Sequence, residues 1–506
     1  MAKTTFGFTN FTAGELSPRL DGRTDLEKYF NGCKTLENMV IHPHGGASRR
    51  PGTNFVSEVK ISANKTRLIP FEFSTTQTYM MEFGNEYIRF HKDNGIITET
   101  GKTISAITKA NPGVVTATSH GYSNGDYVII SGVVGMTELN GRQFKVASVS
   151  THTFALQDMD GNNFDTSSLT TYASAGTAFK IYQIASPYTT AQLFDIKFAQ
   201  SADVMYIVHP SVSIRKLTRS GHTSWTLAAV TITGSPNPSL SSSDNYPSSV
   251  AFFEQRLVFG GTNNNPQSLW FSVAGSYESF ATGTNATDAM IYTIASNQVN
   301  AIRYLSSTTE LLIGTVGGEF VATSGSNSEP ITPTNIQITR QTNYGAANVD
   351  AIQIANVTMF LQRAKRKVRE LVYNYEVDGY IAPDMTILAE HITEGGLTSF
   401  AYQQEPDSIL WATRDDGTLL GLTYQRNEKV IGWHRHILGG YSDSGKTIAR
   451  SFKSFTSNST NVSVANNTIT ISSHGFSTGD PVYYFTSSNA IAVSYTHLTL
   501  PTILRV

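Results

Sequence analysis

Short stretches in which apolar and polar residues alternate recur along the chain. Clear examples are residues 79–83, 204–208, 256–259 and 311–314, which are rich in β-branched or aromatic residues and bounded by turn formers. A period of two places every second side chain on the same face of an extended segment. The pattern predicts many short strands, each with a buried face.

One hairpin and one helix stand out in this pattern. Residues 408–413 and 418–424 alternate on either side of Asp416-Gly417, a pair that tolerates the positive φ angles of a two-residue hairpin loop. Helical periodicity is weak elsewhere, and the best candidate is a short amphipathic helix at residues 385–391. We therefore expect an all-β chain.

Strand–turn–strand units follow one another at even spacing from residue 181 to residue 455, without a strict sequence repeat. Such a succession suits a β-propeller or a row of β-sandwiches. We favour a β-propeller-like body, and the stacked sandwiches remain the alternative.

Composition narrows the class of protein. Of 506 residues, 15% are charged and 40% are hydrophobic, whereas a typical globular chain has about 25% charged residues. The net charge of −2 gives no reason to expect a general polyanion binder. Cys33 is the only cysteine, which excludes an internal disulfide framework and a cysteine-based zinc site. No apolar run approaches the roughly 20 residues that span a bilayer, so no membrane anchor is expected.

One internal repeat is present. The sequence His-Gly-Tyr-Ser-Asn-Gly-Asp-Tyr-Val at residues 120–128 recurs as His-Gly-Phe-Ser-Thr-Gly-Asp-Pro-Val at residues 474–482. The glycines and aspartates predict turns, and no partner residue at ligand spacing supports metal binding by the histidines. The first copy, at residues 102–180, resembles the small β-barrel module called FCCH-like, known from ubiquitin-activating enzymes. That resemblance implies an inserted module without ubiquitin chemistry.

The second copy of the repeat is cut short. It begins at residue 456 and extends to about residue 490, and residues 491–506 resemble translated adapter sequence. We expect this tail to be non-native, with a genuine final strand as the alternative.

Sequence motifs for catalysis are missing from the chain. It has no phosphate-binding loop, dinucleotide fingerprint, nucleophile elbow or H-E-x-x-H motif. His434 and His436 would share one face of a strand, and His42 and His44 flank a proline in a turn, but neither pair has a third ligand. We predict no catalytic residue, no cofactor and no metal site, and therefore a protein that is not an enzyme.

One dense basic cluster is predicted to cap a hairpin between residues 357–361 and 371–375. Its five cations are Arg363, Lys365, Arg366, Lys367 and Arg369. They are candidates for non-specific contacts with DNA phosphates or for a subunit interface. A solvated hairpin tip remains equally open.

The N-terminal residues resemble those of a known family. Residues 11–29, the pair Gly45-Gly46 and the stretch Arg-Arg-Pro-Gly-Thr-Asn-Phe-Val at residues 49–56 are similar to the start of the tail nozzle proteins of short-tailed phages, the tail tubular protein B family. Further similarities follow in the same order at residues 203–209, 246–260, 294–302, 310–313 and 318–321. The evidence lies in the colinear order of these segments.

The resemblance implies a structural protein of the virion tail, made in the host bacterial cytoplasm. Its subunits would form a homo-oligomeric, commonly hexameric ring that retains packaged double-stranded DNA and conducts it during ejection. Its partners would be the phage adaptor and tail-fibre proteins. It also implies an N-terminal hook at residues 1–58 and a propeller body at residues 59–101 and 181–455, interrupted by the module at residues 102–180.

A second hypothesis is a glycan-binding or glycan-cleaving β-propeller. It rests on three tryptophans predicted to lie on strands, Trp270, Trp411 and Trp433. The alternative is that these side chains pack between blades.

Overall fold

The computed structural model describes residues 9–438 except 75, 243, 296–299 and 326–328, together with two short strands, β37 (Val462–Ser463) and β38 (Thr468–Ile469). The predicted second module at residues 456–490, apart from these strands, and the predicted tail at residues 491–506 lie outside the described residues. No helix in the described part is long and apolar enough to cross a membrane.

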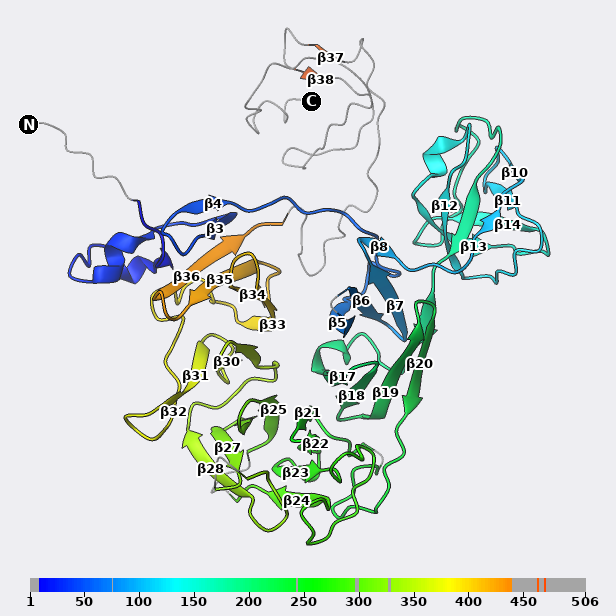
Figure 1. The fold of residues 1–506 in the computed structure, drawn as a ribbon. Coiled ribbons are helices and arrows are strands. Elements are labelled where there is room, and N and C mark those ends of the chain that lie inside the picture. Colours follow the sequence, from blue (N-terminus) through cyan, green and yellow to red (C-terminus); the bar gives the residue numbers. More distant parts are fainter. Residues whose placement is uncertain are drawn as a thin grey trace, which may run out of the picture.

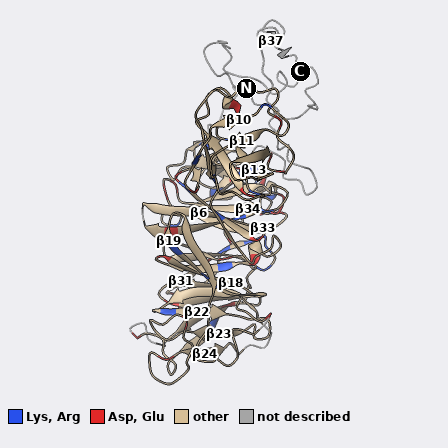
Figure 2. Ribbon diagram, turned by 90° about the vertical axis from the view of Figure 1, so that its right-hand side faces the viewer, with Lys and Arg blue, Asp and Glu red and all other residues tan. Residues whose placement is uncertain are grey.

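Six small sheets, antiparallel except for two short added strands in the last one, stand side by side around a common centre, as Figure 1 shows. In four of them the strands follow one another in chain order, which is the connectivity of propeller blades. The prediction of an all-β protein with a propeller-like body is therefore confirmed. Seen from the side, most of the ribbon is free of charge, and basic and acidic positions are interspersed (Figure 2).

The strands of the blades have the following bounds. Blade 1 contains β5 (Arg67–Ser74), β6 (Gln77–Gly84), β7 (Tyr87–Lys92), β8 (Gly95–Ile96) and β16 (Gln183–Ala185). Blade 2 contains β17 (Lys197–Ser201), β18 (Val204–His209), β19 (Val212–Gly221) and β20 (Ser224–Ala229). Blade 3 contains β21 (Ser249–Phe253), β22 (Arg256–Gly260), β23 (Ser268–Phe271) and β24 (Met290–Thr293).

Blade 4 contains β25 (Ile302–Ser307), β26 (Leu311–Thr315), β27 (Glu319–Thr323) and β28 (Gln337–Thr342). Blade 5 contains β29 (Ile352–Ile354), β30 (Val357–Leu361), β31 (Val368–Asn374) and β32 (Gly379–Ile381). Blade 6 contains β33 (Leu397–Gln403), β34 (Ile409–Arg414), β35 (Leu419–Gln425) and β36 (Val430–His436), extended by β1 (Gly14–Glu15) and β2 (Gly32–Cys33).

Neighbouring blades share their hydrophobic cores through strand alternation. In β18, Met205 and Ile207 pack with blade 1, whereas Tyr206 and Val208 pack with blade 3. Equivalent buried clusters join blades 3 and 4, 4 and 5, and 5 and 6. Among the described residues, no buried cluster contains side chains of both blade 6 and blade 1.

The inserted module forms a sheet of its own between β8 and β16. Its strands are β9 (Lys102–Thr103), β10 (Ala106–Ile107), β11 (Val114–Thr116), β12 (Tyr127–Ser131), β13 (Gln143–Ala147), β14 (Thr153–Gln157) and β15 (Thr177–Lys180). They enclose a separate apolar core, and Figure 1 places the module outside the ring of blades. In the repeated sequence, His120 Nδ1 accepts from the backbone N–H of Tyr122 (3.0 Å), and Asp126 accepts from that of Ser123 (2.8 Å). These are the turn contacts that the sequence predicts.

The N-terminal segment packs on blade 6. It contains the 3₁₀ turns η1 (Pro18–Leu20) and η2 (Glu27–Asn31) and the hairpin of β3 (Met39–Ile41) and β4 (Ala47–Arg49). Two further 3₁₀ turns, η3 (Thr137–Leu139) and η4 (Leu193–Asp195), lie in the module and before blade 2. Strand β1 pairs in parallel with β36, where Gly14 lies opposite Trp433. The buried Glu15 carboxylate holds this contact through an ion pair with Arg435 and a hydrogen bond with His391, each at 2.9 Å.

Two local predictions were wrong. Residues 385–391 form successive turns instead of a helix, because Asp384 accepts from the backbone N–H of Thr386 and competes with helical bonding. The predicted two-residue turn at Asp416-Gly417 is longer: the N–H of Arg414 bonds to the carbonyl of Thr418, which leaves three residues between this bonded pair. Gly417 takes the positive φ (+85°) in this loop.

Replacing Gly14 with alanine should destabilise the protein severely. Gly14 has a φ of +69°, and an added Cβ would lie 2.4 Å from the Trp433 backbone nitrogen. The left-handed conformation costs about 1–2 kcal/mol for an L-residue, and the clash adds to it. Gly22→Ala is the matched control, since Gly22 has a φ of +79° but open space around it. Calorimetry should show a much larger fall in Tm for Gly14→Ala, and equal falls would contradict the close approach.

Candidate interaction sites

The basic cluster occupies the loop between β30 and β31, as predicted. Arg363, Lys365, Arg366 and Lys367 are exposed, and the Lys367 ammonium pairs with Asp384 at 2.8 Å. Arg369 differs because it is buried.

The Arg369 guanidinium serves blade packing. It donates to the Ala382 carbonyl (2.6 Å) and lies 3.5 Å from the centre of the Tyr344 ring. This leaves Arg363, Lys365 and Arg366 as the cations of the loop with the greatest freedom to meet a partner. Their role in DNA or interface contacts stays a prediction.

A cluster of opposite charges crosses the centre of the propeller. Asp350, just before blade 5, pairs with Lys197 of blade 2 at 2.9 Å and with Arg67 of blade 1 at 3.6 Å. Arg67 also donates to the carbonyls of Leu193 (3.0 Å) and Ile196 (2.6 Å). The Lys197 side chain is 3% exposed, so burial lowers its pKa while Asp350 opposes that shift.

The blade topology places this cluster and the basic loop at the same end of the propeller. Lys197 and Arg67 begin the first strands of their blades, and Asp350 precedes the first strand of its blade. In a four-stranded antiparallel blade, the loop between the second and third strands returns to that end. We call it the connector end. Sequence reasoning missed the charge cluster because its members lie far apart in the chain and match no motif.

Asp350→Ala should destabilise the protein by about 3–5 kcal/mol, because it leaves the buried Lys197 ammonium without its partner. Lys197→Met should cost far less, since Asp350 is 41% exposed and water can solvate its carboxylate. Chemical denaturation of the two variants beside the parent protein measures this asymmetry. A loss for Lys197→Met as large as that for Asp350→Ala would overturn the assignment.

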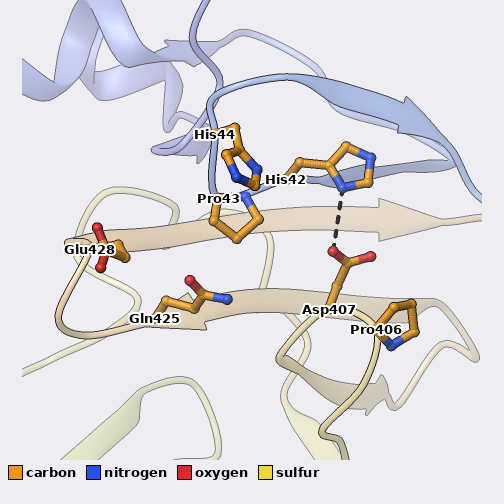
Figure 3. A pocket seen from close by; sticks show the side chains of 7 residues that line it. All are labelled: His42, Pro43, His44, Pro406, Asp407, Gln425 and Glu428. Carbon is orange, nitrogen blue, oxygen red and sulfur yellow. Dashed lines mark hydrogen bonds and ion pairs between the residues drawn. The ribbon is translucent and has the colours of Figure 1, made fainter.

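A shallow polar pocket lies at the opposite end of blade 6. Its volume is about 450 Å³, and Figure 3 shows the side chains that surround it. The lining residues are His42, Pro43, His44, Pro406, Asp407, Gln425 and Glu428. His42 contacts Asp407 through Nδ1 (3.3 Å) and Ser48 through Nε2 (2.7 Å). The predicted turn at His42–His44 therefore forms one wall of a polar cavity.

His434 and His436 share a face of β36, as predicted, but they bond to each other. Nδ1 of His434 lies 2.6 Å from Nε2 of His436, and Nε2 of His434 lies 3.1 Å from the Thr423 hydroxyl. Both side chains are fully buried, whereas Arg435 between them is partly exposed. Among the described residues, no group of three or more His, Cys, Asp or Glu side chains could hold a metal ion.

The buried histidine pair should make stability fall in mild acid. Burial lowers the pKa of His434 to about 3 and that of His436 to about 4. Between pH 6.5 and 4 the unfolded chain therefore binds more protons than the folded chain, and the free energy of unfolding decreases as the pH falls.

Thermal unfolding at pH 7, 6, 5 and 4 tests this dependence. The double substitution His434→Gln/His436→Gln should flatten the decrease in Tm, although its Tm at pH 7 will be lower. His44→Gln at an exposed histidine is the control and should leave the dependence unchanged. An unaltered slope in the double variant would contradict the assignment.

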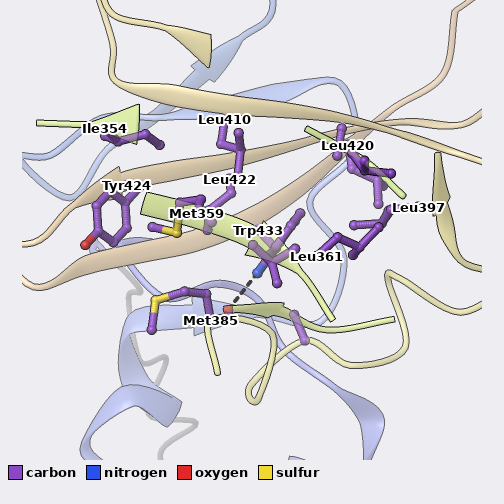
Figure 4. Packing of buried hydrophobic residues seen from close by; sticks show 14 of the residues in the cluster. Ile354, Met359, Leu361, Met385, Leu397, Leu410, Leu420, Leu422, Tyr424 and Trp433 are labelled. Atoms are coloured by element: carbon purple, nitrogen blue, oxygen red, sulfur yellow. Dashed lines mark hydrogen bonds between the residues drawn. The ribbon is translucent and has the colours of Figure 1, made fainter. Parts of the chain in front are cut away.

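The tryptophans behind the glycan hypothesis serve packing, as the alternative predicted. Trp270 and Trp433 are buried, and the Trp433 indole donates to the Met385 carbonyl (2.8 Å) within the core of blades 5 and 6 (Figure 4). Trp411 is partly buried and packs against both histidines of the buried pair. None of the three presents a free aromatic platform.

One face of blade 1 carries exposed apolar side chains. Leu68 is 59% exposed and Met80 39% exposed, whereas their neighbours Ile69 and Met81 are buried against blade 2. We call the space between this face and blade 6 the seam. The sequence could not predict this exposed face, because the residues of β5 do not show which face of the strand packs against another blade.

Comparisons with known proteins identify the inserted module. The model of the family described as "Ubiquitin-activating enzyme E1 FCCH domain" matches residues 110–181. Ubiquitin-like modifier-activating enzyme 1 from Oryctolagus cuniculus is 46% identical over 59 residues, and that from Homo sapiens is 44% identical over 59 residues. The match covers 11% of this chain and only 6% of each relative. The predicted FCCH-like resemblance is confirmed.

Similar solved structures are distant. The β-propeller domain of Myceliophteria thermophila Cps50 (Swd1) is 8% identical with a TM-score of 0.34, covering 72% of this chain and 98% of that one. Phage phi92 endosialidase is 12% identical (TM-score 0.26; 85% and 82% covered), and Citrobacter koseri AztD is 8% identical (TM-score 0.33; 73% and 83% covered). At such scores the likeness says nothing about activity. This chain is thus a β-propeller-like protein with an inserted FCCH-like module.

Proposed function

We propose that this protein is a structural subunit of a short-tailed phage tail, similar to the tail nozzle family, and acts through assembly. The observation that carries the proposal is the uncovered apolar face of blade 1. Leu68 and Met80 are exposed on the face of blade 1 that points away from blade 2. Between successive blades, the corresponding faces pack into a shared core. Contiguous exposed apolar surface is typical of protein–protein contact sites.

The N-terminal resemblance supports the same proposal. The family-like residues Gly14 and Glu15 lie where the N-terminal segment meets blade 6, and Asn38 bonds there to the backbone of Arg435 and Ile437. The segment that resembles the family is thus the one that attaches to blade 6, as a part used in assembly would.

The charge cluster at the centre bears on where DNA would pass. Asp350, Lys197 and Arg67 join three blades across the centre at the connector end. A path for duplex DNA would therefore lie between copies in a ring rather than through one propeller. In that arrangement the exposed cations of the basic loop contact phosphates or a neighbouring subunit.

Electron microscopy of the purified protein, with and without its adaptor ring, tests the proposal. Closed rings of uniform size on the adaptor are the expected result. A particle that stays monomeric at high concentration and ignores the adaptor would contradict it.

Charge reversal of the basic loop should weaken assembly or DNA ejection without unfolding the protein. The triple substitution Arg363→Glu/Lys365→Glu/Arg366→Glu changes three exposed side chains of the loop. The control Lys34→Glu/Lys65→Glu/Lys109→Glu makes the same change in net charge at exposed sites elsewhere. Ring yield and infectivity at several salt concentrations are the readouts, since phosphate contacts weaken steeply with salt. Equal behaviour of both variants would show that the loop is merely solvated.

The polar pocket supports a second candidate function, the binding or cleavage of a glycan. Two carboxylates, two imidazoles and an amide surround the pocket, and such groups can hydrogen-bond sugar hydroxyls. Binding on a glycan array that is lost in Asp407→Asn/Glu428→Gln would favour this function. An array without signal for the parent protein would reject it.

A further inference from the structure

The first described residues attach to one side of the seam. In the described part of the chain, the hydrogen bonds and ion pairs that link residues 10–50 to the propeller end on residues 388–437. The Ser17 N–H donates to the Leu388 carbonyl, and the Lys28 ammonium donates to that of Lys429. This N-terminal segment is thus bound to blade 6 and its preceding connector.

An exposed linker then crosses to blade 1. Residues 51–56 are all exposed and belong to no strand, and Phe55 is 73% exposed. The chain meets blade 1 at Lys60, whose N–H donates to the Glu82 carboxylate (3.2 Å). The nine residues 51–59 can span about 30 Å when extended. The exposed course of residues 51–56 allows the N-terminal segment to bind blade 6 of the same copy or of a neighbouring copy.

Both walls of the seam are incompletely covered. Blade 1 presents Leu68 and Met80, and blade 6 presents the exposed Ala401. The linker that crosses the seam adds the exposed Phe55 and Val56. Among the described residues, Phe55 and Val56 have no apolar cover along the linker, so a second chain packed there would bury them.

We propose that the N-terminal segment, residues 9–50, is exchanged between copies of this chain, so that it binds blade 6 of a neighbour across the seam. Every contact of the segment with blade 6 is kept in the exchange, so only the course of the linker changes. Exchange of an identical element is a low-cost route to an oligomer. Burial of Phe55, Val56, Leu68 and Met80 between copies then favours the exchanged form. The proposal rests on the ring assembly proposed above and names the element that links neighbouring subunits.

Disulfide trapping in the full chain tests the exchange. In a Cys33→Ser background, Glu37→Cys/Arg435→Cys joins positions that are direct partners in a parallel bridge, within the Cα separation a disulfide needs. Because Arg435 also pairs with Glu15, His42→Cys/Asp407→Cys is a second, more peripheral pair. Ser399→Cys/Thr413→Cys, within the hairpin of β33 and β34, is the control for bridging inside one chain.

Oxidised samples are run on denaturing gels without reductant. Exchange predicts covalent dimers and larger products for the first two pairs, and monomers for the control pair. Rings in the microscope whose first two pairs give only monomers would overturn the exchange and leave the ring proposal standing. A monomeric particle with bridges within one chain would overturn both.

Substitutions in the seam give a second readout. Leu68→Asp/Met80→Asp places charge on the uncovered face of blade 1 and should reduce the covalent oligomers at least tenfold. Val134→Asp is the matched control, since Val134 is 51% exposed on the inserted module. If the seam variant gives as many covalent oligomers as the parent protein, the seam does not contribute to the exchange.

Discussion

The organisation of this protein depends on one constraint, that a sheet with apolar side chains on both faces needs cover on both of them. A row of six blades provides five shared cores, and the described residues form all five. Within the described residues, the outer faces of the first and last blades have no blade packed against them. Burying apolar surface there would stabilise the protein by roughly 25 cal/mol for each Å², and this stabilisation has to come from other parts of the chain or from a partner.

The chain covers the two faces by different means. On blade 6, the N-terminal hairpin approaches so closely that a Cβ on Gly432 would meet the Ile41 side chain at 2.4 Å. On blade 1, the buried Arg89 guanidinium lies 4.7 Å from the ring centre of Tyr127 in the inserted module. The module therefore protects one part of the face, and the part around Leu68 stays open.

The sequence predicts what local pattern decides and misses what distant contacts decide. The apolar stretch at residues 204–208 lies in β18, where successive side chains point to opposite faces and pack against blades 1 and 3. The prediction of a helix at residues 385–391 was wrong because the Asp384 carboxylate accepts a hydrogen bond from the backbone N–H of Thr386. The Asp350–Lys197 pair joins blades 5 and 2 and could not be predicted, since spacing along the chain carries no information about it.

The basic loop, residues 363–369, also shows that sequence alone does not reveal which side chains are exposed. Five cations predict a charged hairpin tip, and the hairpin forms, but the strand register decides which of them reach solvent. Arg369 is the second residue of β31 and turns inward onto Tyr344, whereas Lys365 sits in the loop with a φ of +60°. Any partner of this surface therefore meets at most four cations, one of them already paired. So few free cations in one loop suit weak, salt-sensitive contacts with an anionic partner, and tight binding would need further cations from outside the loop.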